Sequence, residues 1–277
     1  MSDDAPPSVT PAPPSVTPAP PPPPPPPRRT IHLYVATPCY ACRMNAAYVA
    51  CLLQLQGECM KRGICVDFDH LGNESLIQRG RNIMIEKFYQ SGAEVLLFLD
   101  ADLAFSAEAI LDRLLPFARA HPEAVVTGVY PKKDWDFSRL DVANTVEPLH
   151  MQACDFNINV TGEAVVDNGF VRVLDSATGC MMIPRAVVAR MRAAHPELHC
   201  VNDINPGKHP VKDYVAIMDC TIEPGTERYL SEDYAFCRRW QALGGEIWVD
   251  LATGMCHIGT RMYSGDIRER CTMSFAS

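Results

Sequence analysis

The sequence lacks the features that mark three common classes of protein. Its 277 residues contain no apolar run near the roughly 20 residues that cross a bilayer. Basic charge is not in excess, because 25 Lys and Arg residues stand against 33 Asp and Glu residues, a net charge of −8. Neither of the usual glycine-rich phosphate-loop patterns occurs. We therefore expect no membrane span, no nucleic-acid partner and no glycine-rich phosphate loop.

The first residues also lack the basic and apolar segments of a secretory signal. We accordingly expect a soluble, cytoplasmic protein whose 12 cysteines are reduced thiols, several of them buried. Cys39 and Cys42 form a single CxxC pair. A second pair for zinc and the bulky flanks of a redox motif are both missing, so we interpret this segment as a loop.

Proline is concentrated in one segment. Fourteen of the 24 prolines lie within residues 1–30, and eight of them are consecutive, at 20–27. Such a chain donates few backbone hydrogen bonds and has little to bury, which predicts a disordered, polyproline-II-like tail. The tail is either a spacer or a ligand for an SH3, WW or profilin-type module. The folded unit is then residues 31–277.

The rest of the chain alternates between strand-like and helix-like patterns. Strands are predicted over 31–36, where Thr37-Pro38 would end the strand, and over 64–68, 95–99 and 124–129. Helices are predicted over 44–61, over 74–89 and after Ser106, a candidate helix cap. The later half is less regular, with strands expected over 171–175, 216–222 and 246–250 and a helix over 232–243. This order predicts an α/β fold with an open sheet flanked by helices.

Two carboxylates, Asp100 and Asp102, directly follow the apolar run 95–99. The carboxyl end of a buried parallel strand is where open α/β sheets place their ligand crevice. On an extended segment both carboxylates would point to one side, and their repulsion would favour a cation between them. Oxygen ligands suit Mg²⁺ or Mn²⁺, which then hold a substrate diphosphate. The alternative is that one aspartate caps the next helix and the other is solvated.

Other residues could complete a site at this edge. His257, flanked by small residues, could coordinate a metal held by Asp102, or could be a packed or surface histidine. Arg79 and Arg81 diverge on their predicted helix, so at most one of them faces the ligand edge, where it can pair with phosphate or with Asp100.

Glu232 and Asp233 follow Ser231 at the predicted start of a helix. Carboxylates are favoured at that position by the helix dipole, and this alone can account for them. The same geometry can also hold an ionised carboxylate that takes a proton from a hydroxyl nucleophile. The spacing leaves both interpretations open.

Seven segments together match the pattern of a known family. In chain order they are 36–40 (ATPCY), 74–82 (ESLIQRGRN), 97–102 (LFLDAD), 128–132 (GVYPK), 176–180 (SATGC), 230–237 (LSEDYAFC) and 257–259 (HIG). The series resembles the GT-A glycosyltransferases encoded by large DNA viruses and phages, and it spans most of 31–277. The resemblance implies the GT-A fold, a Rossmann-like open mixed sheet flanked by helices, in a chain that a virus could encode.

The resemblance also implies roles for individual residues. Asp100-Ala101-Asp102 is similar to the DxD motif, in which Asp102 ligates Mn²⁺ or Mg²⁺ and Asp100 faces the donor ribose or sugar. His257 would be a further metal ligand. The remaining donor contacts implied are Thr37, Pro38 and Tyr40 for the base and ribose, and Arg81 for the nucleotide or Asp100.

Glu232-Asp233 is similar to the xED motif of inverting members, with Asp233 as the catalytic base and Glu232 beside it. Thr178 and Gly179 would line the acceptor side. The resemblance thus implies transfer of a hexosyl or deoxyhexosyl group from a nucleotide-diphosphate donor to a glycan or protein hydroxyl. A UDP-sugar is the leading candidate for the donor.

Three other functions remain open from the residues. A HAD-like phosphatase would use Asp100 as nucleophile, although Leu103-Ala104-Phe105 follows where Thr or Val is usual. A nucleotidyltransferase would use the same aspartates, but its glycine-rich basic first loop is missing. The chain could also be a non-catalytic protein that acts through its proline-rich tail.

Overall fold

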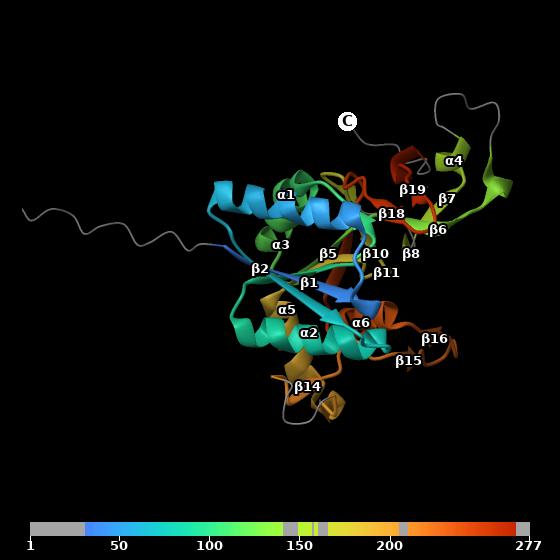
Figure 1. The fold of residues 1–277 in the computed structure, drawn as a ribbon. Coiled ribbons are helices and arrows are strands. Elements are labelled where there is room, and N and C mark those ends of the chain that lie inside the picture. The colour runs from blue at the N-terminus through green and yellow to red at the C-terminus, as the bar shows by residue number, and fades with distance from the viewer. Residues whose placement is uncertain (1–30, 141–148, 157, 160–165, 205–209, 270–277) are drawn as a thin grey trace, which may run out of the picture.

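The computed structural model describes residues 31–140, 149–156, 158–159, 166–204 and 210–269. The proline-rich tail, residues 1–30, lies outside the described residues. The described part is an eight-stranded mixed sheet with helices on both faces (Figure 1), which confirms the predicted open α/β architecture. None of the helices in these ranges is long and apolar enough to cross a membrane.

The sheet has strands of both directions. Its spatial order is β2 (Cys65–Gly72), β1 (His32–Cys39), β3 (Val95–Leu99), β12 (Cys180–Pro184), β5 (Ala124–Gly128), β17 (Glu246–Asp250), β10 (Phe170–Val173) and β9 (Val166–Asp167). β1 is parallel to β2 and β3, and β17 is parallel to β5, whereas β12 is antiparallel to both β3 and β5. Strands β1, β2, β3, β5 and β17 therefore run in one direction, and their carboxyl ends meet at one edge of the sheet.

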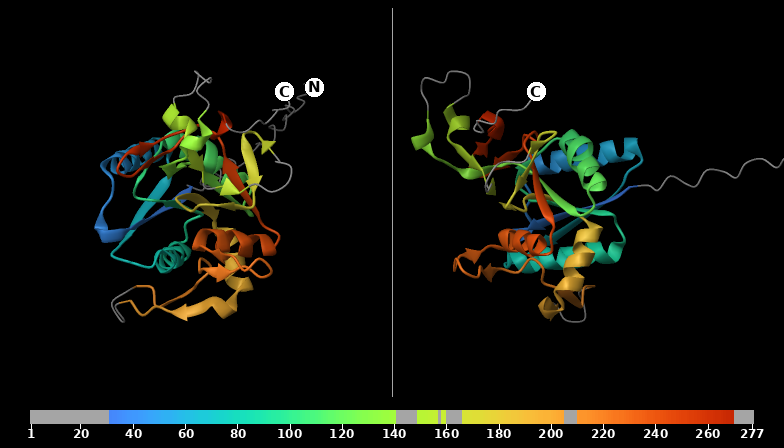
Figure 2. Two further views of the ribbon diagram at one scale, coloured as in Figure 1. Left: turned by 90° about the vertical axis from the view of Figure 1, so that its right-hand side faces the viewer. Right: turned by 180° about the vertical axis from the view of Figure 1, so that it is seen from behind.

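Helices cover the two faces of the sheet. They are α1 (Ala46–Arg62), α3 (Leu115–Ala120) with the π-helical segment Ala109–Leu114 before it, α2 (Ile77–Ser91), α5 (Arg185–Ala194) and α6 (Glu232–Ala242). α1 and α3 lie on one face and α2, α5 and α6 on the other, as the side and rear views also show (Figure 2). Strand β3 serves both layers, since Leu96 and Phe98 pack on the α2 side and Leu97 and Leu99 on the α1 side.

Short elements extend from the carboxyl edge and the periphery. Three short strands form one small sheet, β4 (Leu103–Ala104), β18 (Cys256–Ile258) and β19 (Met262–Tyr263). The other small pairs are β6 (Pro131–Trp135) with β7 (Cys154–Phe156), β8 (Ile158–Asn159) with β11 (Asp175–Ser176), β13 (His199–Val201) with β14 (Asp213–Val215), and β15 (Thr221–Ile222) with β16 (Tyr229–Leu230). The short helix α4 spans Leu149–Gln152.

Local signals in the sequence account for the helix ends. The Asn45 side chain accepts a hydrogen bond from the Ala47 amide at 2.9 Å and begins α1, and Gly63, with a φ of 66°, ends it. Gly92, with a φ of 80°, follows α2 in the same way. The Ser106 hydroxyl accepts from the Ala109 amide at 3.1 Å, so the predicted cap is confirmed.

Several predicted strand boundaries were wrong; β2, for example, continues to Gly72 instead of ending at 68. Strand β1 continues through Thr37 and Pro38, because its pairing with β3 ends at Ala36 and Pro38 breaks no hydrogen bond on that side. Residues 216–220 are not in a strand, and 216–219 form a turn closed by a hydrogen bond from the Asp219 amide to the Ala216 carbonyl. Their apolar members Ile217 and Met218 are buried against the helical layer, where the Asn82 side chain accepts from the Met218 amide at 2.9 Å.

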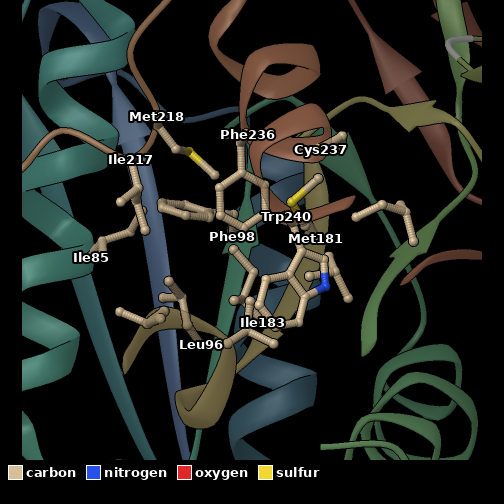
Figure 3. Close-up of a cluster of buried hydrophobic side chains, with 14 of the residues drawn as sticks. Ile85, Leu96, Phe98, Met181, Ile183, Ile217, Met218, Phe236, Cys237 and Trp240 are labelled. Carbon is tan, nitrogen blue, oxygen red and sulfur yellow. The ribbon is translucent and has the colours of Figure 1, made fainter. Parts of the chain in front are cut away.

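The core on the α2 side is built from residues distant in the chain. Figure 3 shows Phe236, Cys237 and Trp240 of α6 packed over side chains of β3 and β12. All three are fully buried, as are Phe98 and Met181 beneath them. Because α6 is held against the sheet over this area, the first turn of α6 has a fixed position relative to the end of β3.

A buried ion pair joins the opposite layer to the sheet. Asp250, at the end of β17, has no exposed surface and accepts two hydrogen bonds of 2.6 Å from Arg113.

We predict that Arg113→Met lowers the free energy of unfolding by about 3 kcal/mol, because it leaves a buried carboxylate without a counter-ion. The matched control Arg172→Met removes an exposed pair with Glu246 and should cost less than about 1 kcal/mol. Urea denaturation of both variants tests this, and equal losses would contradict it.

Candidate active site

A cavity of about 580 Å³ lies at the carboxyl edge of β1 and β3. It is bounded by the segment after β1, the start of α2 and the residues after β3. Six predicted site residues line it, namely Pro38, Tyr40, Arg81, Asp100, Ala101 and Asp102. The parallel direction of β1 and β3 brings these segments together, although they lie some 60 positions apart in the sequence.

Arg81 is the anchor of this cavity. Its side chain is only 6% exposed, and it donates to Asp100 at 3.1 Å and to Glu232 at 2.9 Å. Burial alone would lower the pKa of Arg81, but the two carboxylates raise it, so the guanidinium keeps its charge. Arg79 points elsewhere and binds Glu74, as the divergence of the two arginines predicts.

The two aspartates after β3 do not lie on an extended segment, so this expectation was wrong. The Leu103 amide donates to the Asp100 carbonyl at 3.2 Å, and the chain turns between the two aspartates. Each carboxylate also has a protein cation of its own, Arg81 for Asp100 and Lys133 for Asp102. Both still line the cavity.

Asp102 and His257 are brought together across 155 positions of the sequence. β18 pairs with β4, which places the His257 Nε2 atom 3.4 Å from Asp102 Oδ1. The His257 Nδ1 atom lies 2.9 Å from the Pro131 carbonyl oxygen. A carbonyl can only accept, so Nδ1 carries a proton, and in the neutral form of the ring the lone pair of Nε2 faces Asp102.

These atoms fit a divalent cation. Asp102 Oδ1 is buried and has no hydrogen-bond partner, and it faces the Nε2 atom of His257. Two ligands at right angles on an ion with bonds of about 2.1 Å lie about 3 Å apart, close to the observed separation. Burial alone would raise the pKa of Asp102, but the ammonium of Lys133, and the His257 ring when it is protonated, hold that pKa below the usual range through hydrogen bonds and charge. In the described ranges no third His, Cys, Asp or Glu joins this pair.

Thr178 and Gly179, which were predicted to line the acceptor side, lie beside the end of β3. Gly179 precedes β12, and its carbonyl accepts from the Asp100 amide at 2.8 Å. The Gly179 amide donates to the Tyr130 hydroxyl at 2.9 Å, and burial raises the pKa of Tyr130. Thr178 is buried as well, and its hydroxyl has no hydrogen-bond partner among the described residues.

The segment after β1 forms the opposite wall. Thr37 is buried and does not line the cavity, because its hydroxyl bonds to that of Tyr48. Tyr40, 73% exposed, stands at the mouth. Ala41 and Cys42 have φ values of 57° and 51°, so the CxxC segment is a tight turn, consistent with its interpretation as a loop.

The two carboxylates at the start of α6 differ in environment. Glu232 is buried against Arg81, and burial raises its pKa. Asp233 is half-buried and accepts hydrogen bonds from the Ser231 hydroxyl and, at 2.8 Å, from the Tyr234 amide. The structure thus brings Glu232 directly into the Asp100 network, with Asp233 next to it on the first turn.

Two residues of the site were not among the predicted ones. Tyr130 contacts Gly179 and lies edge-on to the His257 ring at 5.3 Å between centroids, and Lys133 binds Asp102. Both follow β5, whose carboxyl end reaches the same edge as that of β3. The sequence signal was their place after an apolar strand-like run, but the pairing that brings β5 near β3 runs through β12, which was not predicted.

No protein-family model matches the sequence, and no curated protein matches it. Among solved structures, A197 from STIV is 12% identical with a TM-score of 0.45, over 83% of this chain and 86% of that one. S. aureus TarS 1-349 in complex with UDP is 13% identical with a TM-score of 0.38, over 85% and 60%. A glycosyltransferase involved in the glycosylation of the major capsid of PBCV-1 is 10% identical with a TM-score of 0.31, over 65% and 71%. These similarities are too distant to assign a function. A functional assignment therefore has to rest on the side chains of the site.

Gly179 should tolerate no side chain. A Cβ atom there would lie 2.2 Å from the Tyr130 hydroxyl oxygen and 3.0 Å from Asp100 Oδ2. We predict that Gly179→Ala lowers the free energy of unfolding by about 1–3 kcal/mol, because Tyr130 and Asp100 must move. Gly57→Ala is the control: it lies within α1 with nothing near its Cβ, and it should stabilise by about 0.5–1 kcal/mol. Urea denaturation measures both, and a neutral Gly179→Ala would contradict the packing described.

Proposed function

We propose that this protein is a metal-dependent glycosyltransferase with a GT-A fold that uses a nucleotide-diphosphate sugar, a UDP-sugar in the first place. One observation carries the proposal: a buried Asp102 oxygen without a hydrogen bond faces His257 Nε2, 3.4 Å away, beside a cavity at the carboxyl edge of the sheet. A site for a divalent cation next to a cavity of about 580 Å³ suits a cation-bound diphosphate and its nucleoside.

The donor would lie along the cavity from Tyr40 to Asp102. Pro38 and Tyr40 would contact the base and ribose, with the exposed Tyr40 ring at the entrance. Asp100 is held by Arg81 and would accept a hydrogen bond from a ribose or sugar hydroxyl. Asp102 and His257 would hold Mn²⁺ or Mg²⁺, which when bound neutralises the leaving diphosphate.

The acceptor would approach from the side of Thr178, Gly179 and α6. Asp233 would take the proton of the acceptor hydroxyl while that oxygen bonds to the anomeric carbon and the bond to the diphosphate breaks on the opposite face. Glu232, bound to Arg81, would position the first turn of α6. The product would then have inverted configuration, and the acceptor would be a glycan or protein hydroxyl.

The metal site gives the first test. We predict that Asp102→Ala abolishes the Mn²⁺-dependent part of UDP binding, and that His257→Ala weakens it strongly, because each removes one of two protein ligands. Asp112→Asn, an exposed aspartate on the helical segment Ala109–Leu114, is the control and should bind as the wild type does. Calorimetric UDP titrations with and without Mn²⁺ measure this.

Wild-type metal dependence in both site variants would contradict the proposed cation site. A wild-type protein that releases phosphate from a generic phosphomonoester, and does not hydrolyse any UDP-sugar, would instead support the phosphatase alternative.

The base gives a second test, which separates chemistry from binding. Asp233→Asn keeps the size and capping ability of the side chain but cannot accept the acceptor's proton. We predict normal Mn²⁺ and UDP affinity and a kcat reduced by roughly 10²-fold or more. If Asp233 is only a helix-start carboxylate, turnover stays near normal and stability falls by about 1 kcal/mol or less. Steady-state kinetics and UDP titration of this variant decide between the two, with Asp112→Asn again as control.

A further inference from the structure

The Lys133 side chain has defined contacts at both of its ends, beside the proposed cation site. It lies on β6, and its ammonium bonds to Asp102 Oδ2, while Oδ1 of the same carboxylate faces His257. The Lys133 stem packs over Gly259, where an added Cβ would come within 3.2 Å of Lys133 Cδ. Gly259 follows β18, so the same short segment supplies His257 and the space for the Lys133 stem. Both ends of the lysine side chain are therefore accommodated.

The ammonium competes with a divalent cation for Asp102. A positive charge on one oxygen of a carboxylate reduces the attraction of the other oxygen for a second cation. Lysine carries a compact charge on a flexible stem and also binds phosphate. The Lys133 side chain is 38% exposed, so it can move without disturbing the core. A diphosphate beside Asp102 would lie within reach of the same ammonium.

We propose that Lys133 is a mobile counter-ion shared between Asp102 and the donor diphosphate. Before the nucleotide binds, it neutralises Asp102; when a divalent cation takes Asp102, the ammonium moves to a diphosphate oxygen. Lys133 is thus a donor-binding residue that lowers the affinity for the cation alone and raises the affinity for the cation and nucleotide together. This inference rests on the proposed function of the site.

The test compares Lys133→Met with Lys132→Met in the full chain. Lys132 is the matched control, because it is the adjacent residue, is 39% exposed and pairs with a different carboxylate, that of Asp155, at 2.7 Å. With Mn²⁺ alone, followed by electron paramagnetic resonance of the free ion, Lys133→Met should bind about 3- to 10-fold more tightly than the wild type. With Mn²⁺ saturating, calorimetry should show UDP bound about 3- to 10-fold more weakly. Lys132→Met should change neither constant.

The opposite signs of the two effects distinguish this role from others. A merely structural ion pair would lower the melting temperature of Lys133→Met and change neither affinity, which would overturn the inference. Weaker Mn²⁺ binding in Lys133→Met would also overturn it, because the lysine would then order the site instead of competing for it. Lys133→Gln should reproduce both shifts if the lost charge, and not the new methionine, causes them. A wild-type protein that binds neither Mn²⁺ nor UDP refutes the proposed function and this inference together, whereas a binding wild type matched by Lys133→Met refutes the inference alone.

Discussion

Arg81 reaches from α2 into the interior, where its guanidinium meets Asp100 after β3 and Glu232 at the start of α6. A buried charge of this kind costs several kcal/mol to desolvate and is tolerated only when its partners are well placed. Neither carboxylate has another protein cation within ion-pair distance among the described residues. Three segments far apart in the sequence are thereby fixed at one point, and the cavity is arranged around that point.

Close approach of backbone segments is the second constraint on the site. Gly179 lets the Tyr130 hydroxyl bond to the backbone just before β12, and Gly259 leaves space for the Lys133 stem. Tyr130 also contacts the His257 ring, and the Pro131 carbonyl orients that ring. The segment after β5 therefore controls the orientation of His257, the position of Gly179 and the charge beside Asp102. Residues 129–133, which include no acidic residue and no histidine, therefore carry much of the organisation of the site.

Local pattern predicted many of the elements well. The strands over 95–99 and 246–250 have the predicted bounds, because acidic residues mark the ends of the apolar runs Val95–Leu99 and Ile247–Val249. The helices α1, α2 and α6 lie within three residues of their predicted ends, where caps and glycines give clear signals. The prediction failed for Pro38, whose place in a strand depends on which neighbours β1 has, and for 216–220, where burial comes from packing on helices and not from pairing. Strand β12 was missed although Cys180–Ile183 is a buried apolar run, and its antiparallel insertion between β3 and β5 depends on pairing with distant strands.

The sequence by itself determined the α/β class and the edge of the sheet at which Asp100 and Asp102 emerge. It also determined that at most one of Arg79 and Arg81 could face that edge. All three follow from periodicity and strand direction. Only the tertiary structure decided which side chains meet there. The pairing of β18 with β4 places His257 against Asp102, the insertion of β12 brings Gly179 and Tyr130 to Asp100, and β6 delivers Lys133. Each of these contacts joins residues 30 to 155 positions apart, and their side-chain geometry depends on sheet order and packing, which no local pattern encodes.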